Sequence, residues 1–167
     1  MLNLRLAADI TIDSVVDGPG LRTVVWCQGC VHQCPECHNP ATHCPTGGFE
    51  KTVSAIIREI LAVPMQSGVT FSGGEPMLQA KSCAAVARAL KEQGRNIWCY
   101  TGFTFEELLE QPECVQFLNH IDVLVDGKFV PEMKSYNLPF RGSANQRLIA
   151  VPESLRRKQA VLLRHSL

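Results

Sequence analysis

The sequence lacks the features that would suit a membrane or a nucleic acid. Its 167 residues contain no apolar run that approaches the roughly 20 residues of a transmembrane helix. Lysine plus arginine equals aspartate plus glutamate at 16 each, so no excess of one charge attracts nucleic acid or an anionic surface. Residues 1–13 include Arg5, Asp9 and Asp13 and have no continuous apolar core, which argues against a signal peptide. We therefore expect a soluble, cytoplasmic protein.

Repeats, low-complexity tracts and linkers are also lacking, so we expect a single domain over residues 1–167. A chain of this length buries about 70% of its unfolded surface, which is enough to fold without disulfides. Eight cysteines are nevertheless present, and five of them lie between Cys27 and Cys44. In a reducing compartment, clustered cysteines indicate metal ligands or catalytic groups more than disulfides. The three isolated cysteines are expected to pack in the core: Cys83, Cys99 and Cys114.

Short β-branched or aromatic runs alternate with helical patterns along the chain. The runs that predict strands are Arg22–Trp26, Val69–Ser72, Ile97–Tyr100, Asp122–Val125 and Gln146–Val151. Apolar periodicity and stop signals predict helices over 52–62, 80–93 and 112–119, and Thr104 with Glu107 forms a capping box for another. We therefore expect an α/β fold, an open partial (β/α) barrel of about five to six mainly parallel strands with flanking helices.

Three cysteines follow the first predicted strand with the spacing Cys-x3-Cys-x2-Cys: Cys30, Cys34 and Cys37. A zinc site would add Cys27, but only three residues would separate the two pairs, whereas zinc ribbons have roughly 15–20. A closed four-iron cluster would recruit Cys27 or Cys44 as its fourth thiolate. A cluster held by the three cysteines alone would leave one iron open to a substrate or cofactor. The spacing by itself leaves all three interpretations open.

A second motif, Ser-Gly-Gly-Glu-Pro over residues 72–76, ends the second predicted strand. Glycines at the end of a strand let the backbone approach a ligand closely, because they carry no Cβ. On its own, this run is equally compatible with a tight turn between a strand and a helix. Because ligands of open α/β sheets bind beyond the carboxyl ends of the strands, the two motifs together indicate one site.

The two motifs resemble those of the radical S-adenosylmethionine enzymes, which have such a cluster-binding loop and a Gly-Gly-Glu motif. More narrowly, the chain resembles the activases of glycyl-radical enzymes, and among them those of the anaerobic ribonucleoside-triphosphate reductase. The matching segments extend from about residue 10 to residue 151, nearly the whole chain. Besides the two motifs they are Val16–Arg22, Gln28–Cys30, Cys37–Pro40, Tyr100–Phe103, Asp122–Lys128 and Phe140–Arg147.

The resemblance implies a set of site residues. Cys30, Cys34 and Cys37 would bind a [4Fe-4S] cluster, and the amino and carboxylate groups of S-adenosylmethionine would chelate its fourth iron. Cofactor binding would involve the backbone of the glycine pair, the stretch around the third cysteine and an Asp-x-Lys pair. These residues are Glu36, Cys37, His38, Gly73, Gly74, Glu75, Asp126 and Lys128. Glu75 would act by stabilising the glycine loop.

The resemblance also implies the reaction and the partners. One-electron reduction of S-adenosylmethionine would give methionine and a 5′-deoxyadenosyl radical, so no side chain is assigned a catalytic role. The radical would remove a hydrogen from a glycine of the large subunit of the anaerobic ribonucleoside-triphosphate reductase. A low-potential donor such as flavodoxin would supply the electron.

Glu36 departs from the pattern, because many related enzymes have an aromatic residue there, close to the adenine. Adenine packing would then depend on another residue, such as His38. Cys27 and Cys44 are expected to be bystanders. Two alternatives stay open: an activase of another glycyl-radical enzyme, such as a pyruvate formate-lyase, and a non-catalytic iron–sulfur or zinc protein.

Overall fold

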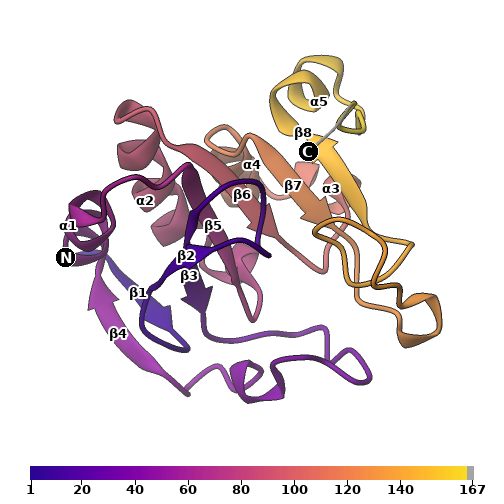
Figure 1. The fold of residues 1–167 in the computed structure, drawn as a ribbon, viewed down its shortest axis with the longest axis horizontal. Helices are drawn as coiled ribbons and strands as arrows, with labels where there is room; N and C mark the ends of the chain where they lie inside the picture. Colours follow the sequence, from indigo (N-terminus) through magenta and orange to yellow (C-terminus); the bar gives the residue numbers. More distant parts are fainter. Residues whose placement is uncertain (165–167) are drawn as a thin grey trace.

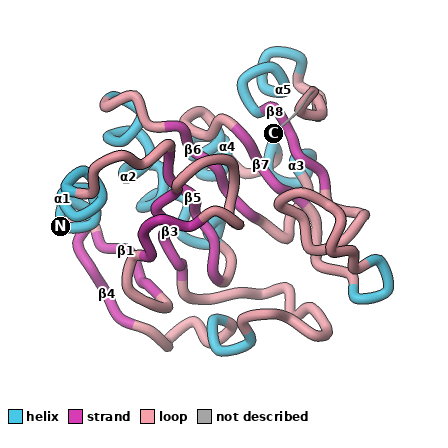
Figure 2. Tube along the Cα trace, viewed as in Figure 1, coloured by secondary structure: helices cyan, strands magenta, loops and turns pink. Residues whose placement is uncertain are grey.

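The computed structural model of the protein describes residues 1–164, and residues 165–167 at the end of the expected domain lie outside that range. The described part contains eight strands and five α-helices (Figures 1 and 2). The strands are β1 (Asn3–Leu6), β2 (Thr11–Ser14), β3 (Arg22–Cys27), β4 (Phe49–Thr52), β5 (Gly68–Gly73), β6 (Asn96–Tyr100), β7 (Val123–Asp126) and β8 (Arg147–Ala150). The α-helices are α1 (Val53–Ala62), α2 (Ala80–Glu92), α3 (Phe105–Leu109), α4 (Pro112–Leu118) and α5 (Val151–Arg157). Short 3₁₀ helices are η1 (Pro40–Thr42), η2 (Pro76–Gln79) and η3 (Pro131–Met133).

The strands form one mixed sheet in the order β4-β1-β3-β5-β6-β7-β8, with β2 paired to β3. The four central strands β3, β5, β6 and β7 are parallel to their neighbours in this group. The other pairings, on both sides of this centre, are antiparallel. The predicted α/β class is confirmed. In the described residues the sheet has more strands than the five or six expected, and its parallel part is confined to the centre.

The predicted elements with strong apolar patterns lie where we expected them. All five predicted strands and the three helices predicted with bounds are present to within about one residue at each end. The fourth predicted helix, α3, begins directly after Thr104. The capping box of α3 is formed as predicted, since Thr104 accepts from the Glu107 backbone and Glu107 from the Thr104 backbone. Strands β1, β2 and β4 were not predicted. Each has four residues, and β2 and β4 are largely exposed, so their sequences carry little apolar alternation.

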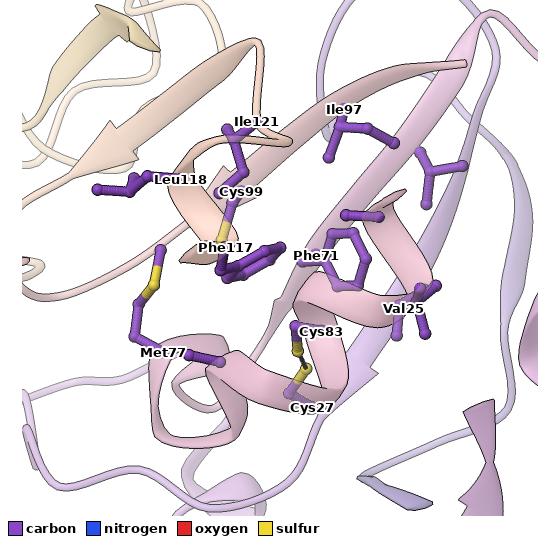
Figure 3. Packing of buried hydrophobic residues seen from close by; sticks show 14 of the residues in the cluster. Val25, Cys27, Phe71, Met77, Cys83, Ile97, Cys99, Phe117, Leu118 and Ile121 are labelled. Carbon is purple, nitrogen blue, oxygen red and sulfur yellow. Dashed lines mark hydrogen bonds between the residues drawn. The ribbon is translucent and has the colours of Figure 1, made fainter. Parts of the chain in front are cut away.

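The main core lies between one face of the sheet and helices α1 to α4. Alternate side chains of a strand point to opposite faces of the sheet, so every second residue of a central strand can contribute to this core. Figure 3 shows Phe71 of β5 against Phe117 of α4, with ring centroids 5.2 Å apart. It also shows Cys27 beside Cys83, with the two sulfurs 3.8 Å apart. Burial raises the pKa of the Cys83 thiol well above its usual range. The predicted core positions of all three isolated cysteines are confirmed, since each is at most 2% exposed.

The parallel centre brings four loops to one end of the sheet. Because β3, β5, β6 and β7 run in the same direction, the segments that follow them leave from the same edge. Figure 1 shows the loop from β3 to β4 and the loop from β7 to β8 extending beyond this edge. Among residues 1–164, no helix is both long enough and apolar enough to cross a bilayer.

Candidate functional site

A pocket of about 180 Å³ lies at the carboxyl ends of the four central strands. The loop after β3 contributes three cysteines to its wall, Cys30, Cys34 and Cys37. The ends of β5 and β6 contribute the segments 72–74 and 100–102, and the loop after β7 contributes Gly127 and Phe129. The cysteine motif and the glycine motif, which are far apart in the sequence, therefore share one pocket.

The three cysteines of the predicted ligand set are partly buried, and the two extra thiols nearby are not part of the pocket wall. Cys27 is buried in the core beside Cys83. Cys44 is exposed, and hydrogen bonding by Thr46 lowers its pKa. Neither alternative fourth ligand therefore lines the pocket in this structure.

The backbone of the cysteine loop is hydrogen-bonded directly to the glycine turn. Gly74 N donates to Cys27 O at 2.8 Å, and Glu75 N donates to Gly29 O at 2.7 Å. On the other side of the loop, Cys30 N donates to His43 O at 3.2 Å. The first cysteine is thus held between the glycine turn and the segment that follows η1 and leads into β4.

The two glycines are needed for these contacts. Gly73 has φ +101°, and a Cβ there would lie 2.6 Å from Cys27 O. A Cβ on Gly74 would lie 2.3 Å from Gly29 O. The sequence predicts that the missing Cβ atoms make room for a ligand. In the structure they make room for the backbone of the cysteine loop, while the glycines themselves still line the pocket.

Glu75 is fully buried and connects three loops. Its Oε1 accepts from Met77 N at 3.0 Å and from the Thr101 hydroxyl at 2.9 Å. Its Oε2 accepts from Gly102 N at 2.8 Å and lies 2.6 Å from Nε2 of His32. A carboxylate offers about four acceptor sites, so these four donors occupy all of them. Glu75 therefore organises the pocket wall and has no acceptor left for a ligand.

Two rings from different loops lie close together in the pocket wall. The ring of His38 lies 5.2 Å from the ring of Phe129, and both line the pocket. Glu36, which precedes the third cysteine, is exposed with φ +53° and is not among the lining residues. Phe129 thus supplies, from the loop after β7, an aromatic face that the cysteine loop lacks.

The predicted Asp-x-Lys pair has other neighbours than a cofactor. Asp126 is buried, and its carboxylate accepts from Phe105 N at 2.8 Å and from Arg147 Nε at 2.9 Å. Lys128 is exposed, and neither side chain is among those that line the pocket. Gly127, between them, does line it. Asp126 joins β7, α3 and β8, and the cofactor role predicted for this pair has no support from these contacts.

Sequence reasoning missed several residues of the wall. His32, Thr101, Gly102 and Phe129 line the pocket but were not assigned to the site. A signal was present for two of them, because the segment Tyr100–Phe103 matches the resembled family. The positions of His32 and Phe129 could not be predicted from the sequence, since they depend on contacts between loops.

The donor set fits an iron–sulfur cluster. Thiolates are the usual ligands of iron–sulfur clusters. Within residues 1–164 no three His, Cys, Asp or Glu side chains are arranged around a single metal ion. A four-iron cluster does not need such an arrangement, because each cysteine binds a different iron. Burial raises the pKa of the Cys30 thiol, with Glu75 among the further causes, so binding to a metal is what would favour its thiolate.

The pocket also contains an unpaired polar atom that a ligand would satisfy. Nε2 of His43 is buried without a hydrogen-bond partner among the described residues, and His43 lines the pocket. Leaving a buried polar group unpaired costs about 1–3 kcal/mol. A bound group with a donor or acceptor at this point would remove that cost.

Comparison with known proteins agrees with this geometry. The family described as a 4Fe-4S single cluster domain matches residues 16–149, so the fold and the site define an iron–sulfur protein. An anaerobic ribonucleoside-triphosphate reductase-activating protein of Vibrio cholerae is 39% identical over 140 residues, which cover 79% of this chain and 89% of the relative. The protein of that name from Escherichia coli K12 is 35% identical over 141 residues, 79% of this chain and 90% of the relative. The chain belongs to the family of anaerobic ribonucleoside-triphosphate reductase-activating proteins.

A pyruvate formate-lyase-activating enzyme of Clostridium pasteurianum is also similar. It is 38% identical over 118 residues, which cover 65% of this chain and 50% of the relative. The similarity therefore extends to a second activating enzyme, with a different target, over a smaller part of its length.

Proposed function

We propose that this protein is a radical S-adenosylmethionine enzyme that generates a glycyl radical on anaerobic ribonucleoside-triphosphate reductase. The observation that carries the proposal is the meeting of the cysteine loop and the glycine turn in one pocket. Membership of the family of activating proteins supports the reaction and the target. The function that the sequence motifs imply by resemblance thus agrees with the comparison with known proteins and with the geometry of the pocket.

In this proposal Cys30, Cys34 and Cys37 hold a [4Fe-4S] cluster. When reduced, such a cluster supplies one electron for the cleavage of S-adenosylmethionine, which is chemistry of the cofactor rather than of the protein. The protein binds and orients the reactants and excludes water. Three thiols without a fourth from Cys27 or Cys44 support an open position for the methionine end of S-adenosylmethionine.

Different residues of the pocket wall are proposed to bind different parts of S-adenosylmethionine. The backbone of Gly73 and Gly74 is proposed to bind the methionine end, and Cys37 and His38 to lie against the nucleoside. Phe129, whose ring is near His38, is a suitable surface for the adenine. Glu75 acts indirectly, because its acceptor sites are already used by protein donors. Glu36, Asp126 and Lys128 keep their assignment only as predictions from the resemblance.

The proposal also covers the shape of the sheet, the compartment and the electron donor. We infer that the sheet curves as an open partial barrel, since its four central strands all direct their loops to one pocket. A single domain over residues 1–167 agrees with the continuous sheet of the described part. All eight cysteines are free thiols, which agrees with a reducing cytoplasm. A low-potential protein such as flavodoxin is proposed as the electron donor, because the described chain has no second cluster motif.

The proposal is tested by anaerobic reconstitution with iron and sulfide. We expect about four irons per chain, and conversion of S-adenosylmethionine to 5′-deoxyadenosine when a reductant is added. The variant Cys34→Ala should lose the iron, and the variant Cys44→Ala should keep it. A protein that binds zinc instead and forms no 5′-deoxyadenosine would support the structural alternative.

The similarity to the Clostridium pasteurianum enzyme gives a second candidate target. The reaction would be the same, and the radical would be formed on a pyruvate formate-lyase. Incubation of the reduced protein with either target enzyme, followed by electron paramagnetic resonance, separates the two. We expect the glycyl signal with the reductase and none with the lyase.

A further inference from the structure

The side chain of His32 is buried, although the residue belongs to the exposed part of the cysteine loop. It lies between Cys30 and Cys34, and its side chain is only 5% exposed. The next residues on either side, Val31 and Gln33, are both exposed. The loop therefore directs one imidazole inward, between two of the proposed cluster ligands.

The imidazole fits a place made by two other loops. Nε2 lies 2.6 Å from Oε2 of Glu75 in the glycine turn. The ring makes a T-shaped contact with Phe103 of the loop after β6, with centroids 4.5 Å apart and planes at 72°. A Cβ on Gly102 would lie 2.4 Å from the ring, so glycine is what leaves space for it.

The donor in the hydrogen bond between His32 and Glu75 is inferred from the other contacts of Glu75. The two oxygens of Glu75 already accept from the backbone N–H groups of Met77 and Gly102. Thr101 completes the other contacts through its hydroxyl. The carboxylate therefore acts as an acceptor throughout, and His32 Nε2 is the donor. Loss of His32 leaves three donors on Glu75, so the glycine turn keeps most of its support.

The cysteine loop, in contrast, depends on this contact. Within residues 1–164, His32 makes the one hydrogen bond that joins residues 31–36 to another part of the fold. The other hydrogen bonds that join the loop to the rest of the fold lie before His32, at Gly29 and Cys30. Cys34 lies beyond them. After His32, Cys34 O accepts from Cys37 N within the loop, and the ring of His38 packs against Phe129. Without His32, the part of the loop that carries Cys34 is free to shift against the glycine turn.

We propose that His32 is a positioning residue that fixes the cluster loop at a set distance from the Gly-Gly-Glu turn by donating a hydrogen bond to Glu75. The inference rests on the proposed function, because the cluster and S-adenosylmethionine would be held by these two segments. The role is positional, since the Nε2 that faces Glu75 is engaged and no contact with a reacting atom is required.

The test uses anaerobically reconstituted full-length protein as wild type and three variants. His32→Ala removes the donor, His32→Gln keeps a donor near the position of Nε2, and His120→Ala removes a histidine that is not in the pocket wall. For each protein we measure the iron content and the dissociation constant for S-adenosylmethionine. We also measure the change that S-adenosylmethionine causes in the electron paramagnetic resonance spectrum of the reduced cluster. Hydrogen–deuterium exchange of residues 28–38 is measured on the same samples.

We expect His32→Ala to weaken binding of S-adenosylmethionine by about tenfold, the size of effect typical for a hydrogen bond to a charged group. The spectral change should be reduced, and exchange in residues 28–38 should be faster. His32→Gln should restore most of the affinity and the slow exchange, and His120→Ala should match the wild type. If His32→Ala loses iron, recovery of iron in His32→Gln would support the same conclusion.

Two results would overturn the inference: exchange and affinity in His32→Ala equal to wild type, or a glutamine variant as impaired as the alanine variant. A wild type that binds no S-adenosylmethionine would instead refute the proposed function. The exchange comparison would still decide whether His32 holds the loop.

Discussion

Replacing Glu75 by glutamine tests the hydrogen-bond network that organises the pocket. The change keeps the shape of the side chain and turns one acceptor oxygen into an NH₂ donor. Whichever way the amide points, one fixed backbone N–H, that of Met77 or that of Gly102, loses its acceptor. An unpaired buried donor costs about 1–3 kcal/mol. Because hydrogen bonds to a charged group are roughly twice as strong as neutral ones, the remaining bonds are weakened as well.

We therefore expect Glu75→Gln to lower the free energy of unfolding by about 2–4 kcal/mol, a large part of the 5–15 kcal/mol typical of a domain. Urea unfolding of the cluster-free protein under anaerobic, reducing conditions measures it, followed by tryptophan fluorescence. Glu106→Gln is the matched control. Glu106 is exposed and pairs with Arg147 at 2.7 Å, so its loss should cost no more than about 1 kcal/mol. A Glu75→Gln protein within about 0.5 kcal/mol of wild type would refute the reasoning.

Three further predictions concern the pocket and its surroundings. Gly74→Ala should lower both iron content and S-adenosylmethionine affinity, because the new Cβ would meet Gly29 O at 2.3 Å; normal iron content would contradict the assigned packing. Phe129→Leu should weaken S-adenosylmethionine binding by roughly tenfold at most, the size of aromatic stacking effects, without loss of iron; unchanged affinity would remove Phe129 from the adenine site. In the loaded protein, iodoacetamide should label Cys44 first and leave Cys83 unmodified, because the pKa of Cys44 is lowered and that of Cys83 is raised. Peptide mass spectrometry reads the order, and early labelling of Cys83 would contradict its burial.

The parts of the fold that were predictable have local causes. The runs that became β3, β5, β6 and β7 are apolar enough to be recognised one by one, and the capping box of α3 is a contact between residues three apart. Strands β2 and β4 are different. Most of their residues are exposed, so their pairing is decided by the neighbouring strand and not by their own pattern.

The same division applies to the site. The ligand cysteines and the glycine turn were predictable, because the chemistry needs those residue types at close spacing. The contact between His32 and Glu75 was not, since the two residues are 43 positions apart and meet only after β3 and β5 are paired. The burial of Asp126 against Arg147 is also a tertiary contact, between two adjacent strands. It gives a structural reason for an acidic residue that the resemblance had assigned to the cofactor.

The open position of the cluster is tested most directly by electron–nuclear double resonance. The reduced protein is mixed with S-adenosylmethionine carrying ¹⁵N in its amino group, and the unlabelled compound is the control. The account predicts a ¹⁵N coupling to the cluster in wild type, and none in Cys34→Ala, which should hold no cluster. A wild-type cluster without ¹⁵N coupling, in which a fourth side chain of this protein binds the remaining iron, would contradict it.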